Sequence, residues 1–179
     1  AKINCPRLNI FPYFKSSIFR MTKLQQKMPN AIVLGATSGI GRKLAEFLIQ
    51  DGFNVAVTGR RRKLLDELCS RYPENCLAEE LDVQDLPKTE RVFYQLTEEM
   101  GSMDLIIHCA GVGYENPELD WNMEYDTVRT NVLAATLIYD LSFNLFKKQG
   151  FGHLISISSI SFESAFCISC VTLTEPEHI

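Results

Sequence analysis

The chain has 179 residues, of which 46% are hydrophobic and 22% charged, and its formal net charge is −4. This length suits one domain, and the composition is that of an ordinary globular protein rather than a disordered chain. No apolar run approaches the ~20 residues that span a bilayer, and the acidic balance argues against a nucleic-acid partner. The six cysteines are scattered, which predicts no disulfide framework and fits a reducing, cytoplasmic compartment.

Residues 1–30 differ from the rest of the chain in charge. They contain six Lys or Arg and no Asp or Glu, so the net charge of −4 for the whole chain leaves −10 for the remainder. A basic, acid-free segment with Phe and Ile is typical of an organelle-targeting peptide, here residues 1–28. A start of translation at Met21 or Met28 is the alternative. We therefore treat this segment as an extension outside the fold.

Strand-like and helix-like segments alternate from Ala31 onward. Short apolar runs predict buried strands, and apolar residues at helical spacing predict the helices between them. Continuous apolar strands joined by helices require right-handed crossovers and a parallel sheet covered on both faces. The predicted strands are 31–34, 53–57, 76–81, 105–108 and 153–158, and the predicted helices are 40–51, 63–71, 86–100 and 125–148.

A glycine-rich loop follows the first predicted strand and opens the first predicted helix. Gly35 allows the tight turn, Gly39 leaves the backbone open to a pyrophosphate, and Gly41 lets the helix pack closely on the sheet. Free N–H groups and the dipole at the helix start bind the anion. This context predicts a dinucleotide site in a Rossmann-like, doubly wound α/β fold of about five parallel strands, with a turn that binds no ligand as the alternative. The predicted binding residues of the loop are Gly35, Thr37, Ser38, Gly39, Ile40 and Gly41.

The residues after the second predicted strand indicate which dinucleotide binds. An NAD site places Asp or Glu at the end of this strand, whereas an Arg accommodates a 2′-phosphate. Here that position is Gly59, and Arg60 and Arg61 follow. A guanidinium binds phosphate through charge-assisted hydrogen bonds, so we predict NADP(H), with Arg60 as the main contact and Arg61 in support. A solvated charge run is the alternative, although cations at a helix start oppose the helix dipole.

The spacing Gly-x-x-x-Gly-x-Gly in the glycine loop resembles the short-chain dehydrogenase/reductase family over about residues 31–159. The resemblance implies an adenine contact from Asp82, with Val83 beside it. It also implies a close backbone approach to the cofactor at Ala110 and Gly111. The family's Asn-Asn-Ala-Gly element reads His-Cys-Ala-Gly here, so both asparagines are replaced, by His108 and Cys109.

The resemblance further implies an oxidoreductase that interconverts a carbonyl and an alcohol in a small-molecule substrate. Ser159 looks like the catalytic serine that binds the substrate oxygen, and Asn131 looks like the helix asparagine that orders a proton relay. No Tyr-x-x-x-Lys, the family's acid–base pair, occurs in the chain, and the Tyr is expected near Thr172. We therefore expect a C-terminally truncated member, with an inactive NADP-binding or interaction protein as the alternative.

The tail at residues 160–179 does not resemble the family. Cys167 and Cys170 form a lone Cys-x-x-C, which is too weak to predict a metal site. The fifth predicted strand becomes an edge of the sheet unless this tail covers it. The helix at 125–148, through which the family forms homo-oligomers, is expected to leave four leucines partly exposed. These leucines are Leu133, Leu137, Leu141 and Leu145.

Overall fold

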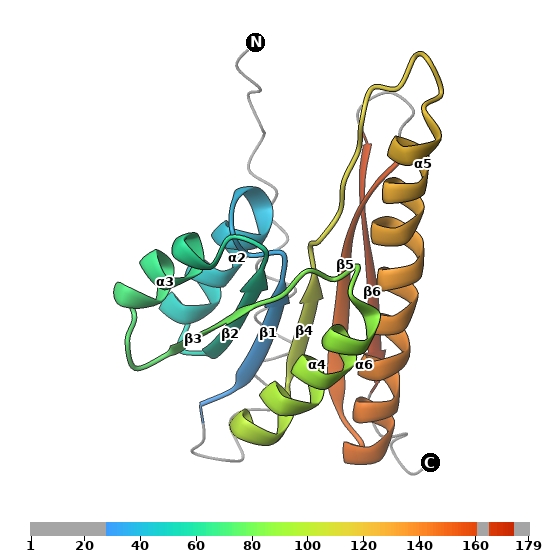
Figure 1. The fold of residues 1–179 in the computed structure, drawn as a ribbon. Helices are drawn as coiled ribbons and strands as arrows, with labels where there is room; N and C mark the ends of the chain where they lie inside the picture. The colour runs from blue at the N-terminus through green and yellow to red at the C-terminus, as the bar shows by residue number, and fades with distance from the viewer. Residues whose placement is uncertain (1–27, 161–164, 174–179) are drawn as a thin grey trace.

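Six strands form one sheet in the order β3-β2-β1-β4-β5-β6 (Figure 1). The computed structural model describes the backbone of residues 28–160 and 165–173 and the side chains of residues 28–158. All neighbours from β3 to β5 are parallel, which confirms the predicted Rossmann-like, doubly wound α/β sheet. In chain order the elements are β1 (Asn30–Leu34), α2 (Gly39–Gln50), β2 (Asn54–Gly59), α3 (Arg62–Ser70), β3 (Cys76–Glu80), α4 (Leu86–Met100), β4 (Leu105–His108), α5 (Trp121–Val128), η1 (Arg129–Ala134), α6 (Ala135–Gln149), β5 (Gly152–Ile160) and β6 (Ala165–Leu173).

The sheet is buried on both faces because successive strand residues point to opposite sides. On one face Ile32 and Ile106 pack against α4 and α6. On the other face Val33 and Ile107 pack against α2 and α3. Figure 1 shows these helix pairs on opposite sides of the sheet. The strand order reverses between β1 and β4, and ligands of such sheets bind outside the carboxyl ends of the strands at this point.

The edge of β5 is covered by a sixth strand. β6 pairs antiparallel with the whole length of β5, from the Gly152–Leu173 pair to the Ile160–Ala165 pair. A segment with Phe, Ile, Val and Thr has the side chains that favour a strand, and pairing satisfies the backbone groups of the edge. The tail therefore closes the edge that the sequence predicts to be open without it.

The helix predicted at 125–148 begins earlier and contains a π-helical segment. α5, η1 and α6 run without interruption from Trp121 to Gln149. Leu133 is exposed, and Leu137 and Leu145 are half-buried, as predicted, but Leu141 is only 4% exposed. The prediction for Leu141 is wrong because its side chain packs in the core formed with α4 and β5. Among the described residues, no helix is long and apolar enough to cross a membrane.

One disulfide was not predicted from the sequence. Cys69, in the last turn of α3, is joined to Cys76, the first residue of β3. The chain returns from α3 to the sheet over only seven positions, so the two side chains meet at the end of this short connection. The scattered spacing of the cysteines, which predicts no disulfide framework, gave no indication of this single pair.

Candidate dinucleotide-binding site

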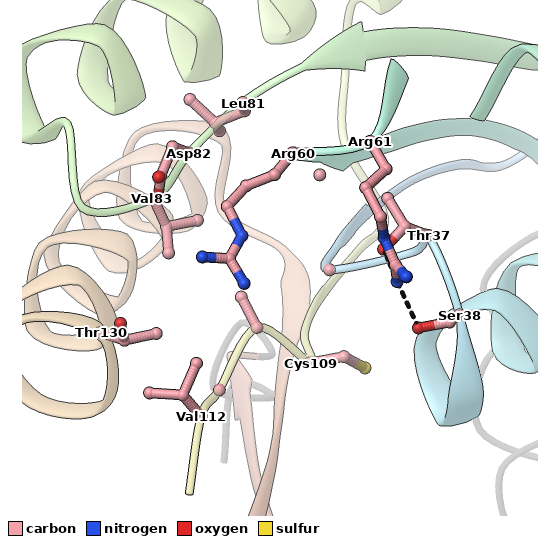
Figure 2. Close-up of a pocket in the computed structure, with 14 residues that line it drawn as sticks. Thr37, Ser38, Arg60, Arg61, Leu81, Asp82, Val83, Cys109, Val112 and Thr130 are labelled. Carbon is pink, nitrogen blue, oxygen red and sulfur yellow. Dashed lines mark hydrogen bonds between the residues drawn. The ribbon is translucent and has the colours of Figure 1, made fainter. Parts of the chain in front are cut away.

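A cavity of about 310 Å³ lies at the carboxyl ends of the parallel strands (Figure 2). It is bounded by the loops that follow β1, β2, β3 and β4, together with η1. The position is the one that the reversal of strand order predicts for a ligand. Nine of the residues predicted to bind the cofactor line it: Gly35, Thr37, Ser38, Arg60, Arg61, Asp82, Val83, Ala110 and Gly111.

Glycine stands at each of the three loop positions for a different structural reason. A Cβ at Gly35 would lie 2.6 Å from the backbone nitrogen of Ala110, and one at Gly41 would lie 2.3 Å from the Gly35 carbonyl oxygen. Larger residues at these two positions would therefore push the loop off the sheet. Gly39 has φ +59° and nothing within 4 Å of a Cβ position. Its left-handed backbone favours glycine, and its open side leaves room for a ligand.

The first turn of α2 is free to bind an anion. Ser38 is its N-cap residue, but its hydroxyl makes no capping hydrogen bond. The first turn contains no acidic side chain that would compete for the positive end of the dipole. Backbone N–H groups at such a helix start are the usual ligands of phosphate. Ile40, in the same turn, is 47% exposed and does not line the cavity.

The two predicted arginines adopt different positions in the cavity. Arg61 donates from Nη2 to Thr37 Oγ1 at 2.8 Å and to Ser38 Oγ at 2.6 Å. Arg60 extends into the cavity with its guanidinium turned away from that of Arg61 (Figure 2). Among the described side chains, none forms a hydrogen bond with the Arg60 guanidinium. A cation without such a partner in a cavity suits an anionic ligand.

Gly59, which precedes these arginines, packs closely against Thr37 of the glycine loop. A Cβ at Gly59 would lie 2.5 Å from Thr37 Cγ2. A side chain at this position would therefore need the Thr37 methyl group to move aside. The end of β2 thus carries no acidic side chain of the kind that marks an NAD site, and Arg60 and Arg61 line the cavity next to it.

Asp82 and Val83 form the wall that follows β3. The Asp82 carboxylate accepts a hydrogen bond from the backbone of Gln84 at 3.1 Å, which fixes the turn. Val83 is 7% exposed, and its carbonyl accepts a hydrogen bond from the Thr89 hydroxyl. An apolar side chain beside a fixed carboxylate suits the flat, polar-edged ring of an adenine.

Asn131 lies in the π-helical segment and holds the loop after β4. Its side chain accepts from the backbone N–H of Val112 at 2.9 Å and donates to the Val112 carbonyl at 2.6 Å. Gly111 lies against the same amide, with a Cβ position 3.4 Å from Asn131 Oδ1. π-helical turns often occur at functional sites. Here the turn carries the side chain that fixes the cavity wall at Gly111 and Val112.

Ser159 lies near the end of β5, where its backbone is in register with Phe166 of β6. Its side chain lies outside the described residues. The structure therefore places Ser159 in β5, one residue beyond the predicted strand 153–158, without showing what its hydroxyl contacts. The roles that the family resemblance implies for Ser159 and Asn131 stay predictions.

His108 and Cys109, which replace two asparagines of the family element, are held neutral by burial. Desolvation lowers the pKa of His108 to about 4 and raises the pKa of the Cys109 thiol to about 12. His108 is 3% exposed, and its Nδ1 has no hydrogen-bond partner among the described residues. Its ring packs edge-on against Tyr139, whose hydroxyl lies 2.5 Å from Ser156 Oγ. Neither replacement supplies an acid–base group near neutral pH.

Some residues around the cavity were missed by sequence reasoning. Val112 continues the Ala-Gly element, so its position in the sequence could have indicated it. Thr130 lines the cavity, and Gln84 bridges its hydroxyl to Asp126 from another loop. These polar residues form no recognisable sequence pattern, since they meet only through the packing of η1 against the loop after β3.

Comparison with known proteins identifies the family. The sequence profile of the short chain dehydrogenase family matches residues 29–169. The chain belongs to this family. An uncharacterised oxidoreductase of Mycobacterium tuberculosis is 34% identical over 138 residues, which are 72% of this chain and 54% of that protein. A probable NADP-dependent dehydrogenase of Haemophilus influenzae is 30% identical over 141 residues, covering 75% of this chain and 55% of that protein.

The structural comparison agrees with this assignment. Serine dehydrogenase, in its closed form complexed with NADP+, superposes with a TM-score of 0.69 at 26% identity. The match covers 76% of this chain and 57% of the serine dehydrogenase chain. The chain thus spans little more than half the length of these relatives.

Proposed function

We propose that this chain is the NADP(H)-binding part of a short-chain oxidoreductase that interconverts a carbonyl and an alcohol in a small-molecule substrate. The observation that carries the proposal is the Arg60 guanidinium, which extends into the cavity without a hydrogen-bond partner among the described side chains. Gly59 beside it provides no carboxylate for the ribose hydroxyl of NAD. Family membership and the NADP named for two relatives support the same cofactor.

The residues of the cavity fit this dinucleotide in three places. The first turn of α2, with Gly39 open beside it, would hold the pyrophosphate. Arg60 and Arg61, with Thr37 and Ser38, would hold the 2′-phosphate. Asp82 and Val83 would bind the adenine. The nicotinamide supplies hydride chemistry when it is bound, and Asn131 fixes the wall at Gly111 and Val112 that would face the cofactor ribose.

A second candidate function follows from the acid–base pair of the family, which this sequence does not contain. The sequence contains no Tyr-x-x-x-Lys, and a Tyr without a neighbouring Lys titrates near pH ~10. This observation favours an NADP-binding or interaction protein without turnover. Asn131 and Ser159 favour the oxidoreductase, in which Ser159 would bind the substrate oxygen and Asn131 would order the proton relay, because a binding module needs neither.

A titration with NADPH and NADH tests the cofactor. We expect NADPH to bind more tightly, and Arg60→Asp to weaken NADPH binding about tenfold to hundredfold while NADH changes much less, because only NADPH carries the 2′-phosphate. Arg62→Asp is the matched control: it changes the same charge in the next turn, but Arg62 pairs with Asp66 outside the cavity. Tighter binding of NADH, or an equal effect of both variants, would refute the cofactor assignment.

A turnover assay separates the two functions. The chain is supplied with NADPH and a panel of aldehydes and ketones, and oxidation of NADPH is followed by absorbance. Turnover that Ser159→Ala abolishes supports the oxidoreductase. NADPH binding without turnover on any carbonyl supports the noncatalytic protein.

The helical face of α5, η1 and α6 supports a homo-oligomer as the assembly of this protein. Four apolar side chains on this face are at least 37% exposed: Val128, Val132, Tyr139 and Phe143. Burying a contiguous apolar stripe against a second copy removes it from water. Light scattering after size-exclusion chromatography should give a dimer or larger, and Phe143→Glu should shift it toward the monomer. A monomeric wild-type chain would contradict the proposal.

A cytoplasmic location, with targeting by residues 1–28 as the alternative, stays a prediction that imaging of a fluorescent fusion would test.

A further inference from the structure

A polar network lies behind the wall of the cavity that Arg60 faces. At its centre, Asp126 of α5 accepts hydrogen bonds on both carboxylate oxygens. Gln84 donates from its side-chain amide to Oδ1, and the Tyr114 hydroxyl donates to Oδ2 at 2.6 Å. The three residues come from the loop after β3, the loop after β4 and α5. The network therefore joins two walls of the cavity to the long helix.

The network reaches the cavity through two residues that line it. The Gln84 amide also donates to Thr130 Oγ1 at 2.7 Å, and the Gln84 backbone donates to Asp82 at 3.1 Å. Thr130 and Asp82 both line the cavity beside Arg60. The Asp126 carboxylate is thus linked, through the Gln84 side chain, to residues that line the space into which Arg60 extends.

Asp126 stays ionised in this setting. Its pKa is lowered first by the hydrogen bond from Tyr114, then by the bond from Gln84, and further by the positive charges of Arg60 and Arg129. Arg129 also has a hydrogen-bond partner of its own, because it donates to the Gln84 carbonyl at 3.2 Å. Arg60 has no hydrogen-bond partner among the described side chains, and its positive charge contributes to the lowered pKa of Asp126.

We propose that Asp126 is a specificity-determining residue, which serves as the counter-charge of Arg60 in the free protein and selectively weakens binding of the 2′-phosphate. The inference rests on the proposed NADP(H) function. A fixed carboxylate attracts Arg60 when the cavity holds no phosphate, and it repels a phosphate that Arg60 then binds. The 2′-hydroxyl of NADH is uncharged and meets no such repulsion. Asp126 therefore lowers the preference for NADPH over NADH.

Affinities of Asp126→Asn test the selectivity. Asparagine keeps the size of the side chain and an oxygen that accepts from Gln84, but it removes the charge. We expect NADPH to bind about three- to tenfold more tightly, because a partly screened unit charge near a phosphate has an effect of this order, and NADH to be unchanged. Glu124→Gln removes the same charge two residues away, where Glu124 bonds Asn116, and should change neither affinity.

Two binding outcomes would overturn the inference. If Asp126→Asn weakens NADPH binding, the carboxylate positions Arg60 rather than opposing the phosphate. If Glu124→Gln strengthens NADPH binding as much as Asp126→Asn does, the effect is one of overall net charge.

A titration of the free protein tests the coupling without any dinucleotide. The Asp126 carboxyl is followed by NMR in the wild type, in Arg60→Gln and in the control Arg62→Gln. We expect the Asp126 pKa to rise in Arg60→Gln and to stay constant in Arg62→Gln. An unchanged pKa in Arg60→Gln would overturn the inference even if NADPH binds. Failure of the wild type to bind NADPH while the coupling is present would instead refute the proposed function and, with it, the role of Asp126 in selectivity.

Discussion

Acid should destabilise this fold through His108. Its pKa is about 4 in the folded chain, compared with 6.5 for an ordinary histidine. The pKa is lowered because the side chain, at 3% exposure, is buried and an imidazolium there would be removed from water. The folded state therefore binds fewer protons than the unfolded state between these values, so the free energy of unfolding falls as the pH drops from about 6.5 to about 4. A difference of this size corresponds to a loss of about 3 kcal/mol.

Urea unfolding at several pH values between 7 and 4 measures this loss. His108→Asn removes the titrating group and should reduce the loss by most of that amount, whatever it does to stability at pH 7. His153→Asn is the control, since burial also lowers the His153 pKa but the Asp104 charge opposes that shift. The His153→Asn variant should still show the part of the acid-induced loss of stability that comes from His108. Equal acid losses in the wild type and His108→Asn would refute the reasoning.

Three further predictions concern the cysteines and the loop after β4. Replacing Cys69 and Cys76 by serine should lower the free energy of unfolding by about 2 kcal/mol, because the disulfide closes a short loop in the unfolded chain, and a reductant should lower the melting temperature of the wild type but not of the double variant. Cys109 should react slowly with iodoacetamide at pH 8, since its thiol pKa is about 12, and peptide mass spectrometry should show its labelling only after denaturation. Asn131→Ala removes both hydrogen bonds to Val112, so NADPH should bind several-fold more weakly and the chain should lose about 1–2 kcal/mol of stability, as calorimetry and denaturation would measure. Unchanged binding in that variant would show that the loop holds its position without the amide.

The first five strands and the glycine loop were predictable because their causes are local. A short apolar run forms a buried strand, and Gly35 and Gly39 have the positive φ values that their loop requires. The position of the two arginines after β2 in the cavity was predictable for a related reason, since residues at the end of this strand are the ones that meet the ribose of a dinucleotide. Each of these features is contained within about ten residues of sequence.

The tertiary structure alone decided how distant residues share the site. The pairing of β6 with β5 depends on an open edge, which no local pattern describes. The disulfide depends on where α3 ends relative to β3. Gln84 and Asp126 are 42 positions apart, and their contact at the edge of the cavity exists only because α5 packs next to the loop after β3. Sequence therefore indicated nine of the residues that line the cavity, whereas packing brought Thr130 and the Gln84–Asp126 pair to its edge, because interactions depend on distances through space rather than along the chain.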